Sequence, residues 1–243
     1  MNVMHPPFSA QQHLEDGKLH ILLAASGSVA TIKLPKIAEA FGRYKNVSIR
    51  IIVTKSAEKF LVGQSPEQPA LDHLHRLPGV DAIHRDEDEW KIPWIRGEPI
   101  LHIELRKWAH LLLVAPLSAN TMAKMVTGIA DNLLLSVLRA WDTTGTVDIG
   151  FKAKKPLVFV APAMNTAMWS HPVTAKQITL LQDEWGWSHS NNDGWVYLLH
   201  PIEKALACGD TGNGAMMDWT SIVEIVENYT GLKKSSIGPE NGP

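Results

Sequence analysis

The sequence predicts a three-layer α/β fold, in which a doubly wound parallel sheet is covered by helices on both faces. Short continuous apolar runs recur along the chain, as in strands that are buried on both sides. Each run is followed by a short polar turn and then by a helical pattern, the alternation typical of a parallel sheet. The turns should therefore lie together at the carboxyl edge of the sheet, where this class of fold binds its ligands.

The first strand follows a polar, proline-containing stretch, residues 1–17, which we expect to be a disordered arm. The run HILLAA at 20–25 predicts the strand, and the turn SGSV at 26–29 leads into a helix that should reach Phe41, with Gly42 as its C-cap. The N–H groups of such a turn, together with the helix dipole, favour a phosphate group. The turn lacks the GxGxxG spacing, so the fingerprint of a dinucleotide site is absent.

The next two strands are predicted at 47–53 and 80–84. The polar residues TKS, 54–56, stand where the first of them stops, and a short helix should carry residues 57–61. An acidic run, DEDE at 86–89, follows the second strand. We interpret it as a solvated loop, the usual role of a block of like charges.

The central stretch, residues 101–121, combines a helix that carries His102, a buried strand at 110–116 and a polar turn that contains Ser118, Asn120 and Thr121. We expect Pro116 to end the strand and a helix to start near Met122. The alternative is that the polar side chains of this turn only cap that helix. A second run, PLVFVAPAMNTAMW at 156–169, repeats the design with another Ala-Pro and another Asn-Thr turn. The repetition favours two walls of one cleft.

The remaining pattern adds helices, one strand and two polar insertions. The helices are expected at 122–125, 132–141, 171–184 and 221–229, with a break at Gly128, and the strand at 195–199. The insertions, 142–155 and 185–194, are interpreted as surface loops, since such connections are usually shorter. The segment 207–216 has several glycines around Cys208, which predicts a flexible or tightly turned loop.

Composition bounds the class of protein. The chain has 243 residues, 45% of them hydrophobic and 20% charged, with a net charge of −2. These values predict one globular domain, residues 18–230, with a disordered tail at 231–243, and they give no electrostatic reason for binding nucleic acid or an anionic membrane. The N-terminus has no secretory pattern, and no stretch is long and apolar enough to cross a membrane. We expect a cytoplasmic protein.

Cysteine and histidine usage predicts no metal site. Cys208 is the single cysteine, which excludes an internal disulfide and a cysteine-based zinc site. The eleven histidines are scattered, and the nearest pair, His73 and His75, has no third ligand at a usable spacing. Residue patterns alone thus predict a flavodoxin/Rossmann-like protein that binds a mononucleotide. His102, Asn165 and Cys208 are its candidates for acid, base or ligand contact.

Successive motifs then resemble a known family. The segments GSVA, TKSAEKF, DEDEW, LHIELRKWAHLLLVAPLSANTMAK, ADNLL, RAWD, PLVFVAPAMNTAMW and LACGDTGNGAM run in order from Lys18 to Tyr229. They resemble the eukaryotic, monofunctional phosphopantothenoylcysteine decarboxylases, members of the homo-oligomeric flavin-containing cysteine decarboxylases. The combination of PAMNxxMW with ACGDxGNGAM is the most specific part. The two insertions depart from the family pattern.

The resemblance implies an FMN-dependent carbon–carbon lyase of coenzyme A biosynthesis. Its reaction converts 4′-phospho-N-pantothenoyl-L-cysteine to 4′-phosphopantetheine: flavin oxidises the cysteine thiol to a thioaldehyde, CO2 leaves, and the resulting enethiol is reduced again. The resemblance implies His102 as base, Cys208 as proton donor, and Asn165, Met164 and Ala207 as substrate contacts. The FMN contacts that it implies are Gly27, Ser28, Val29, Thr54, Lys55, Ser56, Ser118, Ala119, Asn120, Thr121 and Ala163.

The family also implies a homotrimer with each site between subunits, His102 of one facing Asn165 and Cys208 of its neighbour. The main rival function is that of an inhibitory subunit of protein phosphatase 1, the role of fungal relatives of this fold. Those regulators carry long N-terminal extensions and an acidic tail, whereas this chain ends in KKSSIGPENGP. Peptidyl-cysteine decarboxylation and flavin prenyltransfer are further alternatives, and the ACGDTGNGAM segment argues against the last. A fused synthetase domain, as in bacterial enzymes, is not expected at this length.

Overall fold

The predicted fold class is confirmed by a six-stranded, wholly parallel sheet in the order β5-β2-β1-β6-β7-β8. The computed structural model describes residues 8–148, 150–152, 154–188, 190, 193–205 and 211–232. The central strands are β1 and β6, which pair with each other from Ile21↔Leu111 to Ala24↔Val114. The sheet strands are β1 (Leu19–Ala25), β2 (Val47–Val53), β5 (Val80–His84), β6 (Leu111–Ser118), β7 (Leu157–Ala163) and β8 (Val196–Leu198).

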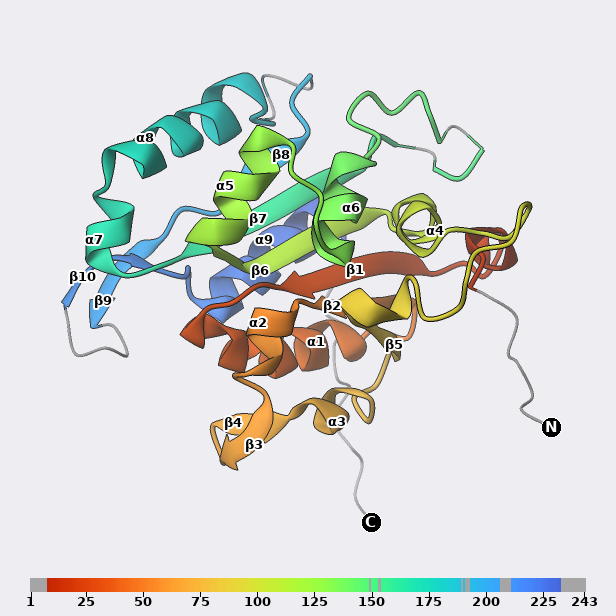
Figure 1. Ribbon diagram of the computed structural model, residues 1–243, viewed down its shortest axis with the longest axis horizontal. Helices are drawn as coiled ribbons and strands as arrows, with labels where there is room; N and C mark the ends of the chain where they lie inside the picture. Colours follow the sequence, from red (N-terminus) through yellow and green to blue (C-terminus); the bar gives the residue numbers. More distant parts are fainter. Residues whose placement is uncertain are drawn as a thin grey trace, which may run out of the picture.

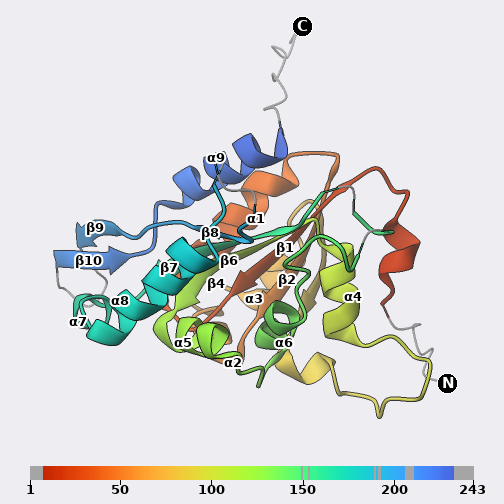
Figure 2. The same cartoon turned by 90° about the horizontal axis from the view of Figure 1, so that it is seen from above.

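Helices cover both faces of the sheet, as Figures 1 and 2 show. Helices α1 and α9 lie on one face, and α4, α5, α6 and α8 lie on the other. The helices are α1 (Leu34–Gly42), α2 (Lys55–Glu58), α3 (Leu71–Leu74), α4 (Leu101–Trp108), α5 (Ala119–Thr127), α6 (Leu133–Arg139), α7 (Thr166–Trp169), α8 (Pro172–Thr179) and α9 (Trp219–Thr230). Shorter helical turns are η1 (Ala10–His13), η2 (Val29–Lys33), η3 (Asp86–Asp88) and η4 (Leu180–Glu184).

The continuous apolar strands divide their side chains between two cores. In β1, Ile21 and Leu23 pack under α1 and α9, whereas Leu22 and Ala24 pack under α4, α5 and α6. All four side chains are fully buried. Successive strand residues point to opposite faces, so a strand needs an apolar residue at every position only when both faces are covered. This explains why the runs predicted a parallel sheet.

The prediction that Pro116 ends its strand is wrong. Strand β6 continues to Ser118, and helix α5 begins at Ala119 rather than near Met122. Proline has no N–H to donate, so its ladder is interrupted locally, and the register with β7 shifts between Val114 and Leu117. Pairing then resumes with Leu117↔Pro162 and Ser118↔Ala163. The two Ala-Pro strands thus run side by side to the edge of the sheet.

Residues 8–17 are packed against the domain, in contrast to the predicted disordered arm. Ala10 is buried, and its N–H donates to the Glu104 carboxylate at 2.8 Å. The ring of Phe8 lies 3.6 Å from the Arg50 guanidinium carbon, and Arg50 Nη1 lies 3.3 Å from His84 Nε2. Few residues of this segment are apolar, so its sequence gives no hydropathy pattern that would predict these contacts. Residues 1–7 lie outside the described residues, as do residues 233–243, which make up most of the predicted tail.

Two small antiparallel hairpins were not predicted. The first pairs β3 (Val62–Ser65) with β4 (Gln68–Ala70), and the second pairs β9 (Ile202–Ala205) with β10 (Thr211–Ala215). Their strands are short and rich in polar residues or glycine, so they lack an apolar signal. Within the described part of the chain, none of the helices has the length and apolar character needed to cross a bilayer.

Candidate functional site

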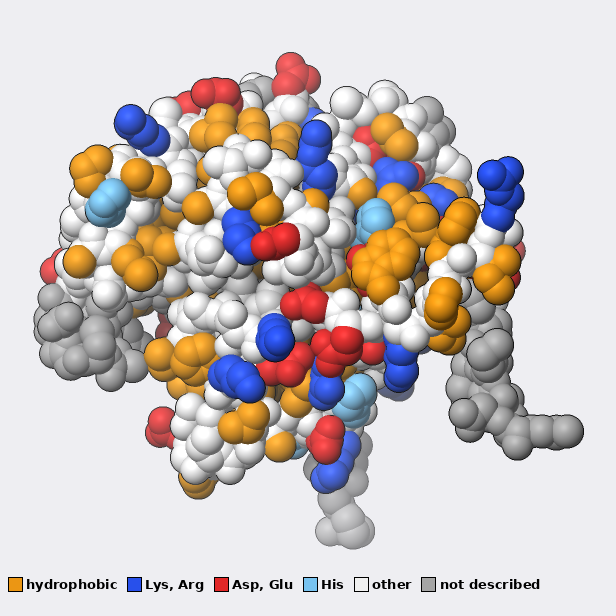
Figure 3. Space-filling view, in the orientation of Figure 1, with side chains coloured by type: hydrophobic (Ala, Val, Ile, Leu, Met, Phe, Trp, Pro, Cys, Tyr) orange, Lys and Arg blue, Asp and Glu red, His pale blue; other side chains and the backbone are white. Residues whose placement is uncertain are grey.

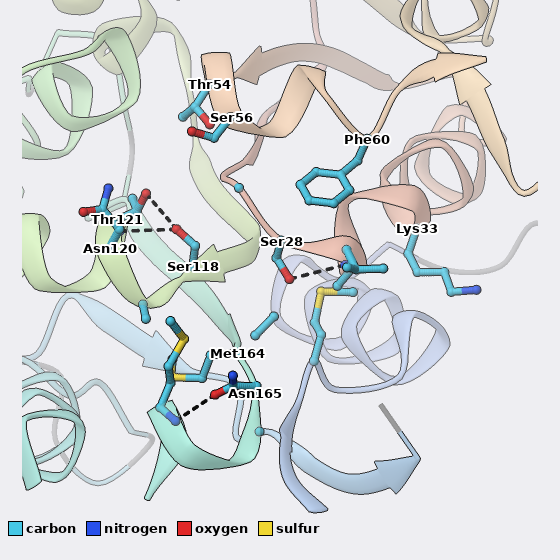
Figure 4. Close-up of a pocket in the computed structure, with 18 of the residues that line it drawn as sticks. Ser28, Lys33, Thr54, Ser56, Phe60, Ser118, Asn120, Thr121, Met164 and Asn165 are labelled. Atoms are coloured by element: carbon cyan, nitrogen blue, oxygen red, sulfur yellow. Dashed lines mark hydrogen bonds between the residues drawn. The ribbon is translucent and has the colours of Figure 1, made fainter. Parts of the chain in front are cut away.

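A cavity of about 820 Å³ opens at the carboxyl edge of the sheet. Residues from the turns after β1, β2, β6 and β7 line it, together with residues 214–219, which run from the end of β10 to the start of α9. Figure 4 shows Thr54 and Ser56 on one side of the cavity and Met164 and Asn165 on the other. The strand-end turns therefore converge as the sequence predicted, and the volume suits a nucleotide-sized ligand.

Each strand-end turn begins with a helix cap. Ser28 accepts the N–H of Ala30 at 3.3 Å, Thr54 accepts that of Ala57 at 3.4 Å, and Ser118 accepts that of Thr121 at 3.3 Å. The alternative that Ser118 caps its helix is therefore true, yet Ser118 also lines the cavity. Residues in the first turns of these helices line the same cavity, and helix N-termini favour anions.

A buried serine joins the two central strand ends. Ser26 is fully buried, donates its hydroxyl to the Pro116 carbonyl at 3.1 Å and accepts the Ser118 N–H at 2.7 Å. Gly27 is needed beside it, because a Cβ at this position would stand 2.6 Å from the Ser56 Cβ. The turns after β1, β2 and β6 are thus held against each other before any ligand binds. The pattern SGS could have suggested this role for Ser26, but the sequence analysis did not assign it.

The second wall follows β7. Asn165 caps α7 by accepting the Met168 N–H at 2.8 Å, so its amide NH2 is the part that can donate to a ligand. Met164 donates its N–H to the Gly214 carbonyl at 3.0 Å, which ties the wall to β10. Gly214 has φ +121°, and a Cβ there would lie 2.7 Å from the Met164 carbonyl oxygen. Only glycine allows this close approach without strain.

Charged groups at the cavity are mostly engaged with the protein itself. Asp86 accepts the N–H of Lys55 at 3.3 Å and that of Leu133 at 3.2 Å, and so joins the starts of α2 and α6. Lys124 forms an ion pair with Asp131. Asp86 lines the cavity and the Glu89 side chain is 4% exposed, so the interpretation of residues 86–89 as a solvated loop is wrong for these two residues. Carboxylates that bind backbone amides can be as ordered as neutral caps, and sequence composition does not distinguish them.

Glu89 is a second residue of this acidic run with a partner far from it in the chain. Its side chain is 4% exposed and accepts the Nδ1–H of His102 in a short contact, and the His102 N–H lies 3.3 Å from the same oxygen. The pair fixes the imidazole on the first turn of α4, with Nδ1 as the protonated nitrogen. His102 is not one of the described residues that line the cavity. Within one chain the histidine thus stands apart from Asn165.

The structure brings together nearly all the residues predicted for the cofactor and the substrate. Those that line the cavity are Gly27, Ser28, Val29, Thr54, Lys55, Ser56, Ser118, Ala119, Asn120, Thr121, Ala163, Met164 and Asn165. Ala207 and Cys208 lie outside the described residues. Lining residues that the sequence analysis did not name include Lys33, Phe60, Asn132 and Met168. Asn132 could have been found, because it is an Asn directly before an apolar helix, and it does cap α6.

Fold and site define a class of protein: a doubly wound α/β protein whose site offers helix N-termini and neutral donors to a mononucleotide. The comparisons agree. The Flavoprotein family model matches residues 9–231. Phosphopantothenoylcysteine decarboxylase of Arabidopsis thaliana is 45% identical over 87% of this chain and 85% of its own length, and that of Mus musculus is 37% identical over 91% and 92%. The chain therefore belongs to the Flavoprotein family, together with these decarboxylases.

Solved structures give the same result. A PPC decarboxylase mutant complexed with pantothenoylaminoethenethiol has a TM-score of 0.69 and 40% identity, covering 88% of this chain and 99% of that one. The FMN-binding protein AtHal3 has a TM-score of 0.67 and 41% identity, covering 89% and 99%. Another relative, a probable thymidylate synthase of Schizosaccharomyces pombe, is 42% identical over 94% of this chain, which spans only 32% of that protein.

Proposed function

We propose that this chain is an FMN-dependent lyase that decarboxylates 4′-phospho-N-pantothenoyl-L-cysteine to 4′-phosphopantetheine in coenzyme A biosynthesis. The observation that carries the proposal is the cavity between the capped strand ends and the Met164-Asn165 wall. Membership of the Flavoprotein family, and similarity along most of the chain to named decarboxylases, support it. A peptidyl-cysteine decarboxylase would share the cofactor and differ in substrate.

The cavity residues fit FMN by their donor chemistry. The acceptor oxygens of Ser28 and Thr54 already bind helix N–H groups, so these two hydroxyls can donate their protons to a ligand. Ser118 accepts the Thr121 N–H and donates its own proton to Thr121 Oγ1, which leaves the Thr121 hydroxyl proton as the donor of that turn. A phosphate and ring carbonyls need donors of this kind. The residues that would hold FMN are those predicted in the turns at 27–29, 54–56 and 118–121, together with Ala163. Bound FMN would supply an electron sink, accepting two electrons from the substrate CH2–SH group and returning them after CO2 is lost.

Asn165 would bind the substrate carboxylate. Its Oδ1 is occupied by the Met168 N–H, so its NH2 group is oriented as a donor. An amide is neutral, and it holds a carboxylate less tightly than a lysine would. Because departing CO2 is also neutral, strong charge pairing would stabilise the ground state more than the transition state and slow the reaction. Asn165 thus positions the group that leaves without trapping it.

His102 would take up the thiol proton as a base. Its Nδ1–H is donated to Glu89, so Nε2 is the nitrogen that can accept a proton. In the proposed cycle Cys208 returns a proton to carbon after CO2 has left.

We further propose that the working unit is a homotrimer in which His102 of one subunit faces Asn165 and Cys208 of the next. The separation of His102 from the described cavity lining supports a site completed by a second copy. Apolar side chains on both sides add to this support: Trp90, Ile92, Trp94 and Ile95 are exposed on the segment before α4, and Met168 and Val173 are exposed beyond Asn165. Figure 3 shows orange side chains gathered over the segment before α4. Exposed clusters of this kind mark interaction surfaces.

The function is tested by mixing the purified protein anaerobically with 4′-phosphopantothenoyl-L-cysteine and following CO2 and flavin absorbance together. Catalytic CO2 release, with the flavin returning to its oxidised spectrum, is expected. His102→Asn should bind FMN without turnover, and Cys208→Ser should release CO2 once and stall with bleached flavin. Bound FMN without CO2 from the wild-type chain would refute the proposal and favour the regulatory reading, for which inhibition of protein phosphatase 1 is the assay.

The shared site has its own test. His102→Asn and Asn165→Asp are each expected to be inactive. When the two variants are mixed, dissociated and reassembled, roughly a quarter of the sites should regain activity. Random assembly places an intact His102 beside an intact Asn165 in that fraction of the sites. A mixture that stays inactive, although gel filtration shows mixed oligomers, would place both residues of a site in one subunit.

A further inference from the structure

Three side chains at the N-terminal edge of the sheet form a cluster that the decarboxylase chemistry does not use. His13, Asp16 and His20 each direct one ligating atom toward the others, and these atoms all lie within 4.8 Å of one another. His20 is the second residue of β1, whereas the cavity follows the end of that strand, so about 20 Å of extended chain separate the two places. In Figure 1 the red helical turn at the start of the described chain, which includes His13, lies beside α4.

The hydrogen bonds of His20 fix which nitrogen faces Asp16. His20 Nδ1–H donates to the Trp108 carbonyl at 3.1 Å, and the ring is stacked on Trp108 at 4.6 Å. Nε2 therefore points at the Asp16 carboxylate, whose two oxygens lie 2.9 and 3.1 Å away. In the neutral imidazole this nitrogen has only a lone pair, which repels a carboxylate. The contact needs a positive centre between the two groups, either a proton or a metal ion.

His13 supplies the third donor. Its Nδ1 lies 3.4 Å from the Asp16 oxygen that also faces His20. The turn that brings Asp16 back to β1 includes Gly17, whose φ of +69° favours glycine. The side chains of His13 and Asp16 are 26% and 24% exposed, and that of His20 is 5% exposed, so an ion could enter from solvent and meet a rigid ligand. Phe8 and Trp108 flank His13 and form an apolar shell.

The geometry points to a zinc site formed by His13 Nδ1, the Asp16 carboxylate and His20 Nε2, with water as the fourth ligand. Two imidazoles and a carboxylate suit Zn²⁺, which binds them tetrahedrally at about 2.0 to 2.2 Å. Ligand atoms in that geometry stand about 3.3 Å apart, close to the 2.9 Å from Asp16 Oδ2 to His20 Nε2 and the 3.4 Å from Asp16 Oδ2 to His13 Nδ1. The main adjustment is therefore to bring the two imidazoles together, through movement of the partly exposed His13. The bond from His20 Nδ1–H to a backbone carbonyl is the outer contact that zinc-binding histidines usually make.

The ion would clip residues 10–16 onto the start of β1. Other contacts of that segment include the Ala10 N–H bond to Glu104 and the contact of the His13 ring with Trp108. Sequence reasoning missed the cluster because the spacing HxxDxxxH matches neither one helix face nor one strand face. The three residues meet only because a helical turn, a bend and a strand follow one another. The nearby His110 cannot bind the ion through its Nδ1, because that nitrogen accepts the backbone N–H of His20.

The test measures zinc directly in the untagged holoprotein, because a histidine tag would bind the metal itself. After dialysis against micromolar free Zn²⁺, elemental analysis should find one ion per chain in the wild type. His13→Ala and Asp16→Asn should each weaken binding by more than about tenfold. Asp16→Asn keeps an acceptor for the Lys18 N–H, which lies 2.9 Å from Asp16 Oδ1, and His13 is partly exposed, so both variants should fold. Zn²⁺ should also slow proteolytic cleavage at residues 8–17 in the wild type alone.

The matched control is the double variant His73→Ala, His75→Ala, which removes two exposed histidines elsewhere and should bind zinc like the wild type. A wild-type chain that retains no zinc would overturn the proposal and leave a proton-bridged ion pair between His20 and Asp16. Zinc that is retained equally by His13→Ala and Asp16→Asn would place the ion at another site and overturn it as well. Flavin content and decarboxylase activity should not change in any of these variants.

Discussion

Glu89→Gln should slow the proposed decarboxylation while leaving the cofactor in place. Glu89 is almost fully buried, and it accepts both the Nδ1–H and the backbone N–H of His102. Glutamine has nearly the same shape, but its amide can place an NH2 group toward Nδ1. The imidazole would then favour the tautomer that protonates Nε2, the nitrogen we assign as the base. Glu89 acts through His102, so we class it as a positioning residue.

The size of the effect follows from the hydrogen bond that is lost. A hydrogen bond to a charged group contributes about 1.5 to 3 kcal/mol. If that amount supports the base only during proton uptake, kcat should fall by about ten- to 150-fold. KM and flavin content should stay close to those of the wild type, because Glu89 does not line the described cavity. A purely structural role would instead lower stability and flavin content together.

Anaerobic CO2 release at saturating substrate measures this effect, with flavin absorbance recorded in the same sample. Glu87→Gln is the matched control, since Glu87 belongs to the same acidic run and its side chain is 64% exposed. Glu89→Asp should recover part of the rate, because it restores the charge at a greater distance. Wild-type kcat in Glu89→Gln, or a loss of flavin equal to the loss of rate, would show that the pair does not orient the base.

Three further predictions follow from the structure. Gly214→Ala should cost roughly 2 kcal/mol or more in urea unfolding and reduce flavin retention, because its Cβ collides with a backbone oxygen. Gly231→Ala should cost less, because Gly231 has a φ of +72° and a Cβ there would stand in open space. Asn165→Asp keeps its helix cap but repels the substrate carboxylate, so kcat/KM should fall by about a hundredfold or more, and an unchanged value would exclude carboxylate binding there. Burial, with the charge of Arg50, lowers the pKa of His84 to about 3. The unfolded chain binds this proton below about pH 6.5, so the wild type should lose roughly 2 to 3 kcal/mol more than His84→Gln in urea unfolding between pH 7 and pH 4.5; equal losses would contradict this assignment.

The sheet and the converging turns could be predicted because their signals are local. Apolar runs such as Ile21–Ala25 reveal strands that are covered on both faces, and small polar residues after each run reveal the carboxyl edge. The end of the strand that contains Pro116 was harder to predict, because whether a proline ends a strand depends on the neighbouring strand. Here β6 pairs with β7 again beyond Pro116. Propensity alone does not contain that information.

The partners of the charged residues could not be predicted. Asp86 binds two helix starts, and Glu89 binds a histidine on α4, yet both stand in a run that composition assigns to solvent. Burial of a carboxylate depends on donors that arrive from elsewhere in the chain, such as the Leu133 N–H, which is 47 residues away. The packed arm around Ala10 escaped prediction for the same reason, because its contact with Glu104 spans 94 residues.

The order of strands in the sheet has a consequence for how the protein is made. The cavity is lined by residues from Gly27 to Trp219. Strand β1 lies between β2, which is synthesised soon after it, and β6, which is synthesised only after a long intervening stretch. At about 5 to 20 residues per second, roughly 10 to 40 s pass between synthesis of the first wall and the last. A nascent fragment that ends before Trp219 therefore lacks part of the pocket. Complete binding of the cofactor has to wait for that residue, and cellular flavin supply would then set the fraction of new chains that gain the stability of the bound state.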